Sequence, residues 1–176
     1  MSRIPSHTVE DAPAGSRALL QTIAKSSPTG RPLNLHAQMA HAPAVLAAYT
    51  SLRAATAEHG TLDPKVSWAL NVATAAAVGN DYMTGIATRF ARMSGWTEAQ
   101  VAALVADATT GDVRVDALTR VVREAAVRAG SVTDATWQAA RQAGWSDEHL
   151  AEAFAYLGLT VFTGYFLNYA QTAPDA

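Results

Sequence analysis

Apolar positions recur along most of the chain at the three- and four-residue spacing of amphipathic helices, and no stretch alternates like a strand. The clearest example is residues 113–129, whose apolar side chains fall on one helical face. These side chains are Val115, Leu118, Val121, Val122 and Ala125. Alanine, which has the highest helix propensity, supplies about a fifth of the residues. The pattern therefore predicts an all-α protein.

Capping residues and prolines set the expected limits of these helices. Residues 1–15 should form an extended N-terminal arm, followed by a short helix at 16–25 and a turn-rich loop at 26–32. Asp63 before Pro64 is a start signal, and Thr97 with Gln100 forms a capping box. The remaining helices are expected at 34–41 (capped by Asn34), 43–60, 64–79, from Asn80 or Asp81 to 95, 97–107, 113–129, from Thr133, and from Ser146 onward.

Two short segments repeat one another. Gly95-Trp-Thr-Glu-Ala-Gln-Val-Ala102 matches Gly144-Trp-Ser-Asp-Glu-His-Leu-Ala151. In each, glycine should close one helix, the hydroxyl residue should cap the next, and tryptophan should pack into the corner. The repeat predicts two similar helix-turn-helix corners.

The last apolar segment, residues 150–169, is long enough to cross a bilayer and carries a single charge, Glu152. Thr160, Thr163, Asn168 and tyrosines interrupt it, and no basic cluster flanks it. We therefore expect a buried core or interface helix and no membrane association. Its aromatic stripe of Phe162, Tyr165, Phe166 and Tyr169 is more typical of core or subunit interface than of ligand contact.

Length and charge narrow the function classes. A chain of 176 residues is expected to form one domain over residues 1–176. A net charge of -2 gives no electrostatic reason to expect nucleic acid. The start of the chain has no apolar core of a signal peptide, so we expect a cytoplasmic protein. The absence of cysteine excludes disulfides, cysteine–zinc sites and thiol catalysis.

The sequence resembles the carboxymuconolactone decarboxylase and alkylhydroperoxidase-like family over roughly residues 4–175. The resemblance rests on Arg31-Pro-Leu-Asn-Leu35, His41-Ala-Pro43, Leu62-Asp-Pro64, the Gly95–Glu98 corner and Thr160-Val-Phe-Thr-Gly-Tyr-Phe-Leu-Asn168. It implies an alkylhydroperoxidase-like all-helical fold and assembly into a homo-oligomer, a trimer or a hexamer.

The family's peroxidase members carry a glutamate on one helix and a Cys-x-x-Cys-x-x-x-His motif on the next. By the resemblance, the glutamate position falls on Trp68, the cysteines on Asn80 and Met83, and the histidine on Ala87. Decarboxylase-type members lack the cysteines but keep acidic and histidine groups, which are also not at these positions. The resemblance therefore implies a member that is no thiol peroxidase, and it leaves the reaction open.

These replacements suggest a substrate pocket. Asn80, Met83, Thr84 and Ala87 share one helical face, with Ala91, and Trp68 lies on the preceding helix. On the implied fold they would form an apolar slot for a hydrophobic or aromatic small molecule, with Tyr165 and Asn168 on the opposite wall. The alternative is that the slot has filled in and the site is inactive.

The catalytic candidates are Tyr82, Asp81 and His36. Tyr82 lies at a helix N-terminus, where its phenol could donate to an oxyanion or act as a base, or could simply pack at a subunit contact. Asp81 could be a general base, but N-capping is the simpler explanation and the one we favour. His36 could be a base at neutral pH, or a hydrogen-bonded core histidine.

The histidines give no metal site. His36 and His41 are five residues apart, which misses a shared helical face. His149 and Glu152 have ligand spacing but lie on the first turn of a helix whose start should be exposed. The sequence thus predicts no metal and no cofactor, and metal-dependent oxygen chemistry lacks ligands.

Two function classes follow. The leading one is a cofactor-independent enzyme of the decarboxylase, isomerase or cyclase type, acting on a carbonyl or lactone compound through an oxyanion-binding helix end. The alternative is a non-catalytic member that binds a hydrophobic ligand or serves as an oligomeric scaffold. An open cavity around Trp68, Asn80 and Ala87 would favour the enzyme, and a filled one would favour the scaffold.

Overall fold

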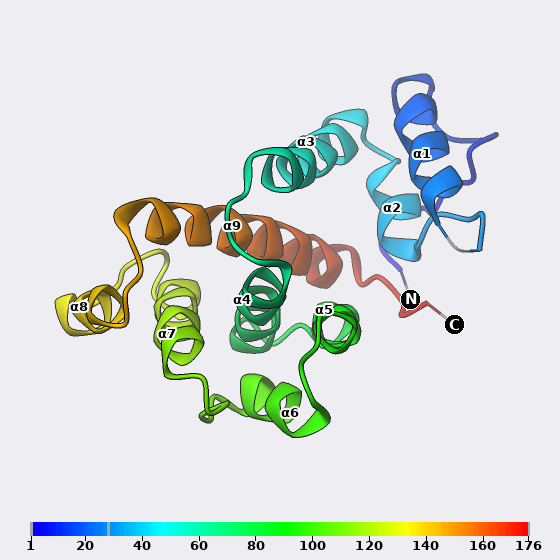
Figure 1. Ribbon diagram of the computed structural model, residues 1–176. Coiled ribbons are helices and arrows are strands. Elements are labelled where there is room, and N and C mark those ends of the chain that lie inside the picture. Colours follow the sequence, from blue (N-terminus) through cyan, green and yellow to red (C-terminus); the bar gives the residue numbers. More distant parts are fainter. Residues whose placement is uncertain (1, 28, 176) are drawn as a thin grey trace. The chain divides into compact units, whose positions relative to one another are not determined.

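A computed structural model describes residues 2–27 and 29–175, and this part of the chain contains helices and no strand (Figure 1). The all-α prediction is therefore confirmed. The helices are α1 (Ala14–Ser26), α2 (Asn34–Met39), α3 (Pro43–His59), α4 (Pro64–Ala77), α5 (Asp81–Met93), α6 (Glu98–Ala106), α7 (Val113–Val127), α8 (Asp134–Gln142) and α9 (Asp147–Ala170).

The chain divides into two compact units. The first contains the described residues up to Ala57 together with residues 165–175, and the second contains residues 58–164. Helices α3 and α9 each pass from one unit into the other. That residues 1–176 form a single folding domain stays a prediction.

The second unit is built around α4, which packs against α5, α6 and α7, while α7 packs against α8 (Figure 1). Eight residues of α4 are buried, so neighbouring segments cover most of this helix. One core cluster joins Ala69 and Val72 of α4 to Ala87 and Ala91 of α5 and to Trp96. A second cluster joins other residues of α4 to α7, α8 and the first part of α9.

In the first unit, the N-terminal arm precedes α1 and is tied to α2. The backbone N–H of His7 donates to the carbonyl of Ala37 at 3.0 Å, and Gln38 Nε2 donates to the carbonyl of Ile4 at 2.9 Å. These bonds use backbone groups that an extended segment would otherwise leave to water. The arm is therefore held in register against α2.

Most expected helix starts are confirmed by their caps. The Asp63 carboxylate accepts from the N–H of Lys65 at 2.7 Å, and Thr97 and Gln100 form the expected capping box. At α5 the cap is Asn80, and Asp81 is the first helical residue. The sequence analysis did not identify Asp112 as the cap of α7.

The expected cap of α2 is wrong. Leu33 occupies the N-cap position, and Asn34 is the first residue of the helix. The N–H of Asn34 donates to the carboxylate of Asp175 at 2.8 Å, and its amide donates to the carbonyls of Ala173 and Pro174. A distant acidic residue thus satisfies the helix end that a local side chain was expected to satisfy.

Both predicted corners form, and they are alike in detail. Gly95 and Gly144 have φ values of 97° and 91°, in the left-handed region that glycine enters without strain. Trp96 Nε1 donates to the carbonyl of Lys65, and Trp145 Nε1 donates to the carbonyl of Arg114, both at 2.7 Å. The side chains of the same two residues lie over these indole rings. Lys65 Nζ is 4.6 Å from the centroid of Trp96, and Arg114 Cζ is 4.2 Å from the centroid of Trp145.

The corners belong to a larger repeat. The second set of residues follows the first by 49 positions, from Lys65 to Arg114 and from Trp96 to Trp145. The capping residues Asp63 and Asp112 keep the same separation. The succession α4–α5–α6 is therefore repeated in sequence by α7–α8–α9, with one tryptophan in each set holding the start of the first helix to the end of the second.

Helix α9 is, among the described residues, the one helix long and apolar enough to cross a membrane by length and composition. Such a helix is weak grounds for a membrane span, because core helices of globular proteins meet the same criterion. Here 44% of its apolar window is buried inside the structure. One of its buried groups, the Thr160 hydroxyl, donates to Asn71 of α4 at 2.9 Å.

Candidate functional site

The N-terminus of α5 carries the positions that the sequence analysis placed in a pocket. Asn80 is buried, and its side-chain oxygen accepts from the N–H of Met83 at 2.7 Å. Its amide donates to the carbonyl of Gly164 at 3.1 Å, across to α9. A β-carbon at Gly164 would lie 3.5 Å from Asn80, in ordinary van der Waals contact, so α5 and α9 are closely packed here. Asn80 thereby fixes where α5 begins.

The rest of the predicted face divides into buried and accessible positions. Ala87 has no exposed surface and lies in the core cluster shared by α4, α5 and α6, as does Ala91. Met83 and Thr84 are half-buried, and the Thr84 hydroxyl donates to the carbonyl of Asn80 at 2.9 Å. Among the predicted pocket positions of this face, Met83 and Thr84 are thus partly accessible, whereas Asn80, Ala87 and Ala91 are buried.

Trp68 lies on α4 and stacks on Phe90 of α5, with ring centroids 4.6 Å apart and planes 12° apart. Both rings are half-buried. An offset stack of this kind holds two adjacent helices together while leaving part of each ring facing outward. The pair forms an aromatic surface on the α4–α5 hairpin.

The catalytic candidates at this helix end differ in exposure. Tyr82 is half-buried in the first turn of α5, and Asp81 is exposed. As the first helical residue, Asp81 adds a negative charge at the positive end of the helix dipole, which stabilises the helix irrespective of chemistry.

His36 lies in the first unit and is buried on α2. Its Nε2 is 3.3 Å from the hydroxyl of Tyr49, and its Nδ1 makes no hydrogen bond. Burial lowers the pKa of His36 from 6.5 to about 4, with a further lowering from the charge of Arg53 and an opposing effect of Asp175. The imidazole is therefore neutral at physiological pH.

Tyr165 and Asn168 lie on α9, in the part that belongs to the first unit, and both are exposed. Trp68, Asn80, Tyr82 and their neighbours belong to the second unit. The roles assigned to all these residues stay predictions.

The comparisons with known proteins agree with this fold. The sequence model of the Carboxymuconolactone decarboxylase family matches residues 43–126, from α3 to α7. Over these residues, slightly less than half of the chain, the sequence is similar to the carboxymuconolactone decarboxylase family. The resemblance inferred from the sequence is thus confirmed, with Asn80, Met83 and Ala87 inside the matched region. The sequence has no significant match among curated proteins.

Solved structures extend the likeness beyond the matched region. A peroxidase-related protein from Ralstonia eutropha JMP134, described as an alkylhydroperoxidase AhpD core, has a TM-score of 0.83 at 19% identity, covering 99% of this chain and 92% of its own. The debrominase Bmp8 has a TM-score of 0.81 at 13% identity, covering 100% and 94%. A peroxidase-related protein from Silicibacter sp. TM1040 has a TM-score of 0.75 at 15% identity, covering 100% and 96%. At these identities the likeness shows the shared fold alone.

The chain contains no cysteine. Thiol chemistry requires a thiolate nucleophile, so it is excluded here. The residues of the α5 cap and first turn that carry side-chain oxygens are Asn80, Asp81, Tyr82 and Thr84.

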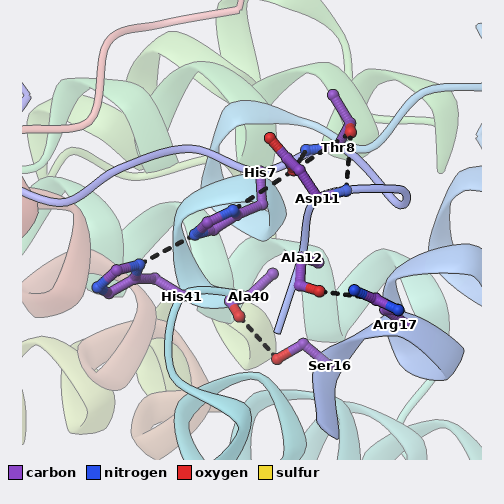
Figure 2. A network of polar contacts seen from close by, with 8 residues as sticks. All are labelled: His7, Thr8, Asp11, Ala12, Ser16, Arg17, Ala40 and His41. Atoms are coloured by element: carbon purple, nitrogen blue, oxygen red, sulfur yellow. Dashed lines mark hydrogen bonds and ion pairs between the residues drawn. The ribbon is translucent and has the colours of Figure 1, made fainter. Parts of the chain in front are cut away.

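A polar group that the sequence analysis missed lies in the first unit. His7 Nε2 and His41 Nδ1 are 2.9 Å apart, and His7 Nδ1 is 3.4 Å from Asp11 Oδ1 (Figure 2). His41 was compared only with His36, its neighbour in sequence, whereas its partner is 34 residues away. The sequence feature that could have indicated this group is the spacing of His7 and Asp11, which lie four residues apart in a segment without helical periodicity.

Among the described residues, no three histidine, aspartate or glutamate side chains lie close enough together to hold a metal ion. The expected spacing of His149 and Glu152 serves other contacts. His149 Nδ1 is 2.9 Å from the Ser146 hydroxyl, and Glu152 accepts from the N–H groups of Thr61 and Leu62. These hydrogen bonds stabilise helix ends and a loop.

A surface hollow of about 450 Å³ lies in the second unit at α7, away from the predicted residues. Its charges are largely paired among themselves. Arg123 Nε is 3.2 Å from Asp107, and Glu124 accepts from Thr133 at 2.9 Å and from Arg128. Arg123 and Glu124 are therefore already engaged within the protein.

Proposed function

We propose that this chain is a cofactor-independent enzyme that performs acid–base or electrostatic chemistry on a small hydrophobic or aromatic carbonyl compound. Decarboxylation, isomerisation and cyclisation are the reaction types that fit. The observation that carries the proposal is the first turn of α5, where Asn80 fixes the helix start and a half-buried tyrosine, Tyr82, follows it. A phenol at the positive end of a helix is suited to stabilise a developing enolate or oxyanion.

The aromatic surface of Trp68 and Phe90 supports the choice of ligand class. Half-buried rings on the α4–α5 hairpin can pack against a flat apolar molecule. A cysteine-to-alanine variant of the debrominase Bmp8, which shares the fold with a TM-score of 0.72 at 14% identity, was crystallised with 2,3,4-tribromopyrrole. The fold thus accepts a small aromatic ring in a protein similar to this one.

The proposal includes a homo-oligomer, a trimer or a hexamer. Phe154 and Tyr169 on α9 are 64% and 71% exposed. Exposed aromatic side chains of this size are typical of surfaces that another subunit covers. A cytoplasmic location is part of the same proposal.

Replacing Tyr82 with phenylalanine tests the proposed site, because the change removes one hydroxyl and keeps the ring. We expect turnover of a responsive carbonyl compound, identified by NMR screening of aromatic acids, ketones and lactones, to fall about a hundredfold. The free energy of unfolding should change by no more than about 1 kcal/mol. An unchanged rate in a folded Tyr82→Phe protein would remove Tyr82 from the mechanism.

The alternative, a non-catalytic ligand-binding or scaffold protein, is favoured by the burial of Ala87 and by the hydrogen bonds that already occupy the Asn80 amide. Trp68→Ala separates the two functions. If Trp68 lines a working site, ligand affinity should fall strongly and stability should fall by less than about 2 kcal/mol. If Trp68 only fills space, the loss should approach about 3–5 kcal/mol, with Phe90→Ala behaving similarly.

Peroxide reduction offers a further check. Since the chain has no thiol, we expect hydroperoxide consumption with dithiothreitol as reductant to stay at the rate of a buffer blank. The assay would follow cumene hydroperoxide in metal-free buffer. Steady consumption proportional to protein concentration would contradict the exclusion of peroxidase activity.

A further inference from the structure

The imidazoles of His7 and His41 lie end to end. Their ring centroids are 5.2 Å apart and their planes differ by 10°, while the facing nitrogens are 2.9 Å apart. The centroid separation is close to the nitrogen–nitrogen distance plus the two ring radii, so the rings share roughly one plane. This geometry suits a direct N–H···N hydrogen bond, in which one ring donates and the other accepts.

Asp11 decides which ring donates. Its Oδ1 is 3.4 Å from His7 Nδ1, a nitrogen that makes no hydrogen bond of its own. A negative carboxylate beside this nitrogen favours a proton on it, and a neutral imidazole carries only one N–H. His7 Nε2 must then be the acceptor, and His41 Nδ1 the donor. The second nitrogen of His41, Nε2, is left with a bare lone pair.

The arrangement is fixed from both sides. The Asp11 carboxylate accepts from the N–H of Thr8 at 2.7 Å and from its hydroxyl at 3.2 Å. These bonds lower the pKa of Asp11 and offset the opposing effect of desolvation, so the carboxyl stays charged. Next to His41, the carbonyl of Ala40 accepts from the buried Ser16 hydroxyl at 2.7 Å (Figure 2). These hydrogen bonds therefore hold Asp11 and the backbone next to His41 in place. We refer to Asp11, His7 and His41 together as the relay.

Exposure differs among the three side chains of the relay. The side chain of His7 is 16% exposed and that of Asp11 is 63% exposed, and His41 lies at the surface. A base must be accessible to its substrate, and His41 meets this requirement. We propose that His41 is a solvent-facing general base for small carboxylic esters, and that His7 and Asp11 are its positioning residues.

The proposed step balances without a further reactant. Nε2 of His41 removes a proton from a water molecule as the water oxygen bonds to the ester carbonyl carbon. Collapse of the tetrahedral intermediate breaks the bond to the leaving oxygen, which receives the proton from His41. The products are a carboxylic acid and an alcohol or phenol. All three residues lie in the first unit, so the proposal stands apart from the function proposed for α5.

The protonation pattern can be measured directly on the whole unmodified chain. We expect long-range proton–nitrogen NMR spectra at alkaline pH to show His41 protonated on Nδ1, the minor form of free histidine. In Asp11→Asn the carboxylate charge is lost while the shape is kept, so His41 should shift toward the Nε2-protonated form. His41 protonated on Nε2 in the unmodified protein would overturn the proposal.

Hydrolysis of p-nitrophenyl acetate tests the chemistry. We expect His41→Gln to lower the protein-dependent second-order rate constant at least tenfold and Asp11→Asn to lower it severalfold. His59→Gln, a change at an exposed histidine at the end of α3, is the matched control and should leave the rate unchanged. Equal rates in the His41 and His59 variants would overturn the proposal, as would a normal rate in Asp11→Asn.

Discussion

Replacing Trp145 with alanine is expected to lower the free energy of unfolding by about 3–5 kcal/mol. The indole is 5% exposed in the core formed by α4, α7, α8 and α9. Its Nε1 holds the carbonyl of Arg114 near the start of α7, and the Arg114 guanidinium covers the ring. Truncation would leave a cavity, would remove the hydrogen-bond donor to the Arg114 carbonyl and would remove the ring over which the Arg114 guanidinium lies. For a domain of ordinary stability this loss is a large fraction of the total.

Urea unfolding followed by circular dichroism measures this loss, and two variants divide it. Trp145→Phe keeps an aromatic ring but removes the donor to Arg114, so we expect it to lose about 1–3 kcal/mol. Trp137→Ala is the control, because this tryptophan on α8 is 37% exposed and outside both core clusters. Its loss should be less than half that of Trp145→Ala. Equal losses at the two positions would show that the corner does not stabilise the fold.

The two repeated corners could be predicted from the sequence because they depend on interactions between residues close together in the chain. Glycine in the left-handed conformation, a hydroxyl cap and an adjacent tryptophan act within a few residues, so their sequence pattern suffices to place them. The burial of both tryptophans follows from their place between two helices. What the pattern does not contain is the partner of each indole, the carbonyl of a residue 31 positions earlier.

The features that could not be predicted from the sequence depend on contacts between segments far apart in the chain. Asn34 was assigned a cap that a carboxylate 141 residues away provides. His7 and His41 meet because the arm folds back on α2, which no periodicity in residues 1–15 indicates. Ala87 was predicted to line a pocket from its place on one helical face, and the structure shows it packed against residues of α4 and α6, while its role stays a prediction. Helical spacing defines which side chains share a face, and tertiary packing decides what that face meets.

His36 shows both what the local pattern predicts and what only tertiary packing decides. Its position inside an apolar helix allowed either a base or a core histidine to be predicted from the sequence. The structure places it 4% exposed, beside Tyr49 and with one ring nitrogen unpaired. Burial favours the neutral form of the imidazole, and this effect outweighs the opposing charge of Asp175, so the pKa of His36 falls to about 4.

Stability should therefore fall as the solution is acidified below about pH 6.5. Between the unfolded pKa of 6.5 and the folded value of about 4, the unfolded chain binds a proton that the folded chain does not. At higher pH both states are neutral at His36 and this contribution is complete. By pH 5 about 2 kcal/mol should be lost, and by pH 4 about 3 kcal/mol, at 1.36 kcal/mol for each unit of difference.

The measurement is the free energy of unfolding in urea at several pH values between 8 and 4, for the unmodified protein and for His36→Gln. The variant cannot titrate at this position, so the difference between the two curves isolates His36, and His59→Gln should follow the unmodified protein. The carboxylates with lowered pKa, such as Glu152 and Asp116, also stabilise the fold less in acid, but their effect begins near the unfolded carboxyl values of 4.5 and 3.8. A slope between pH 6.5 and 5 that persists unchanged in His36→Gln would mean that the imidazole is protonated in the folded protein, which would contradict its burial as a neutral ring.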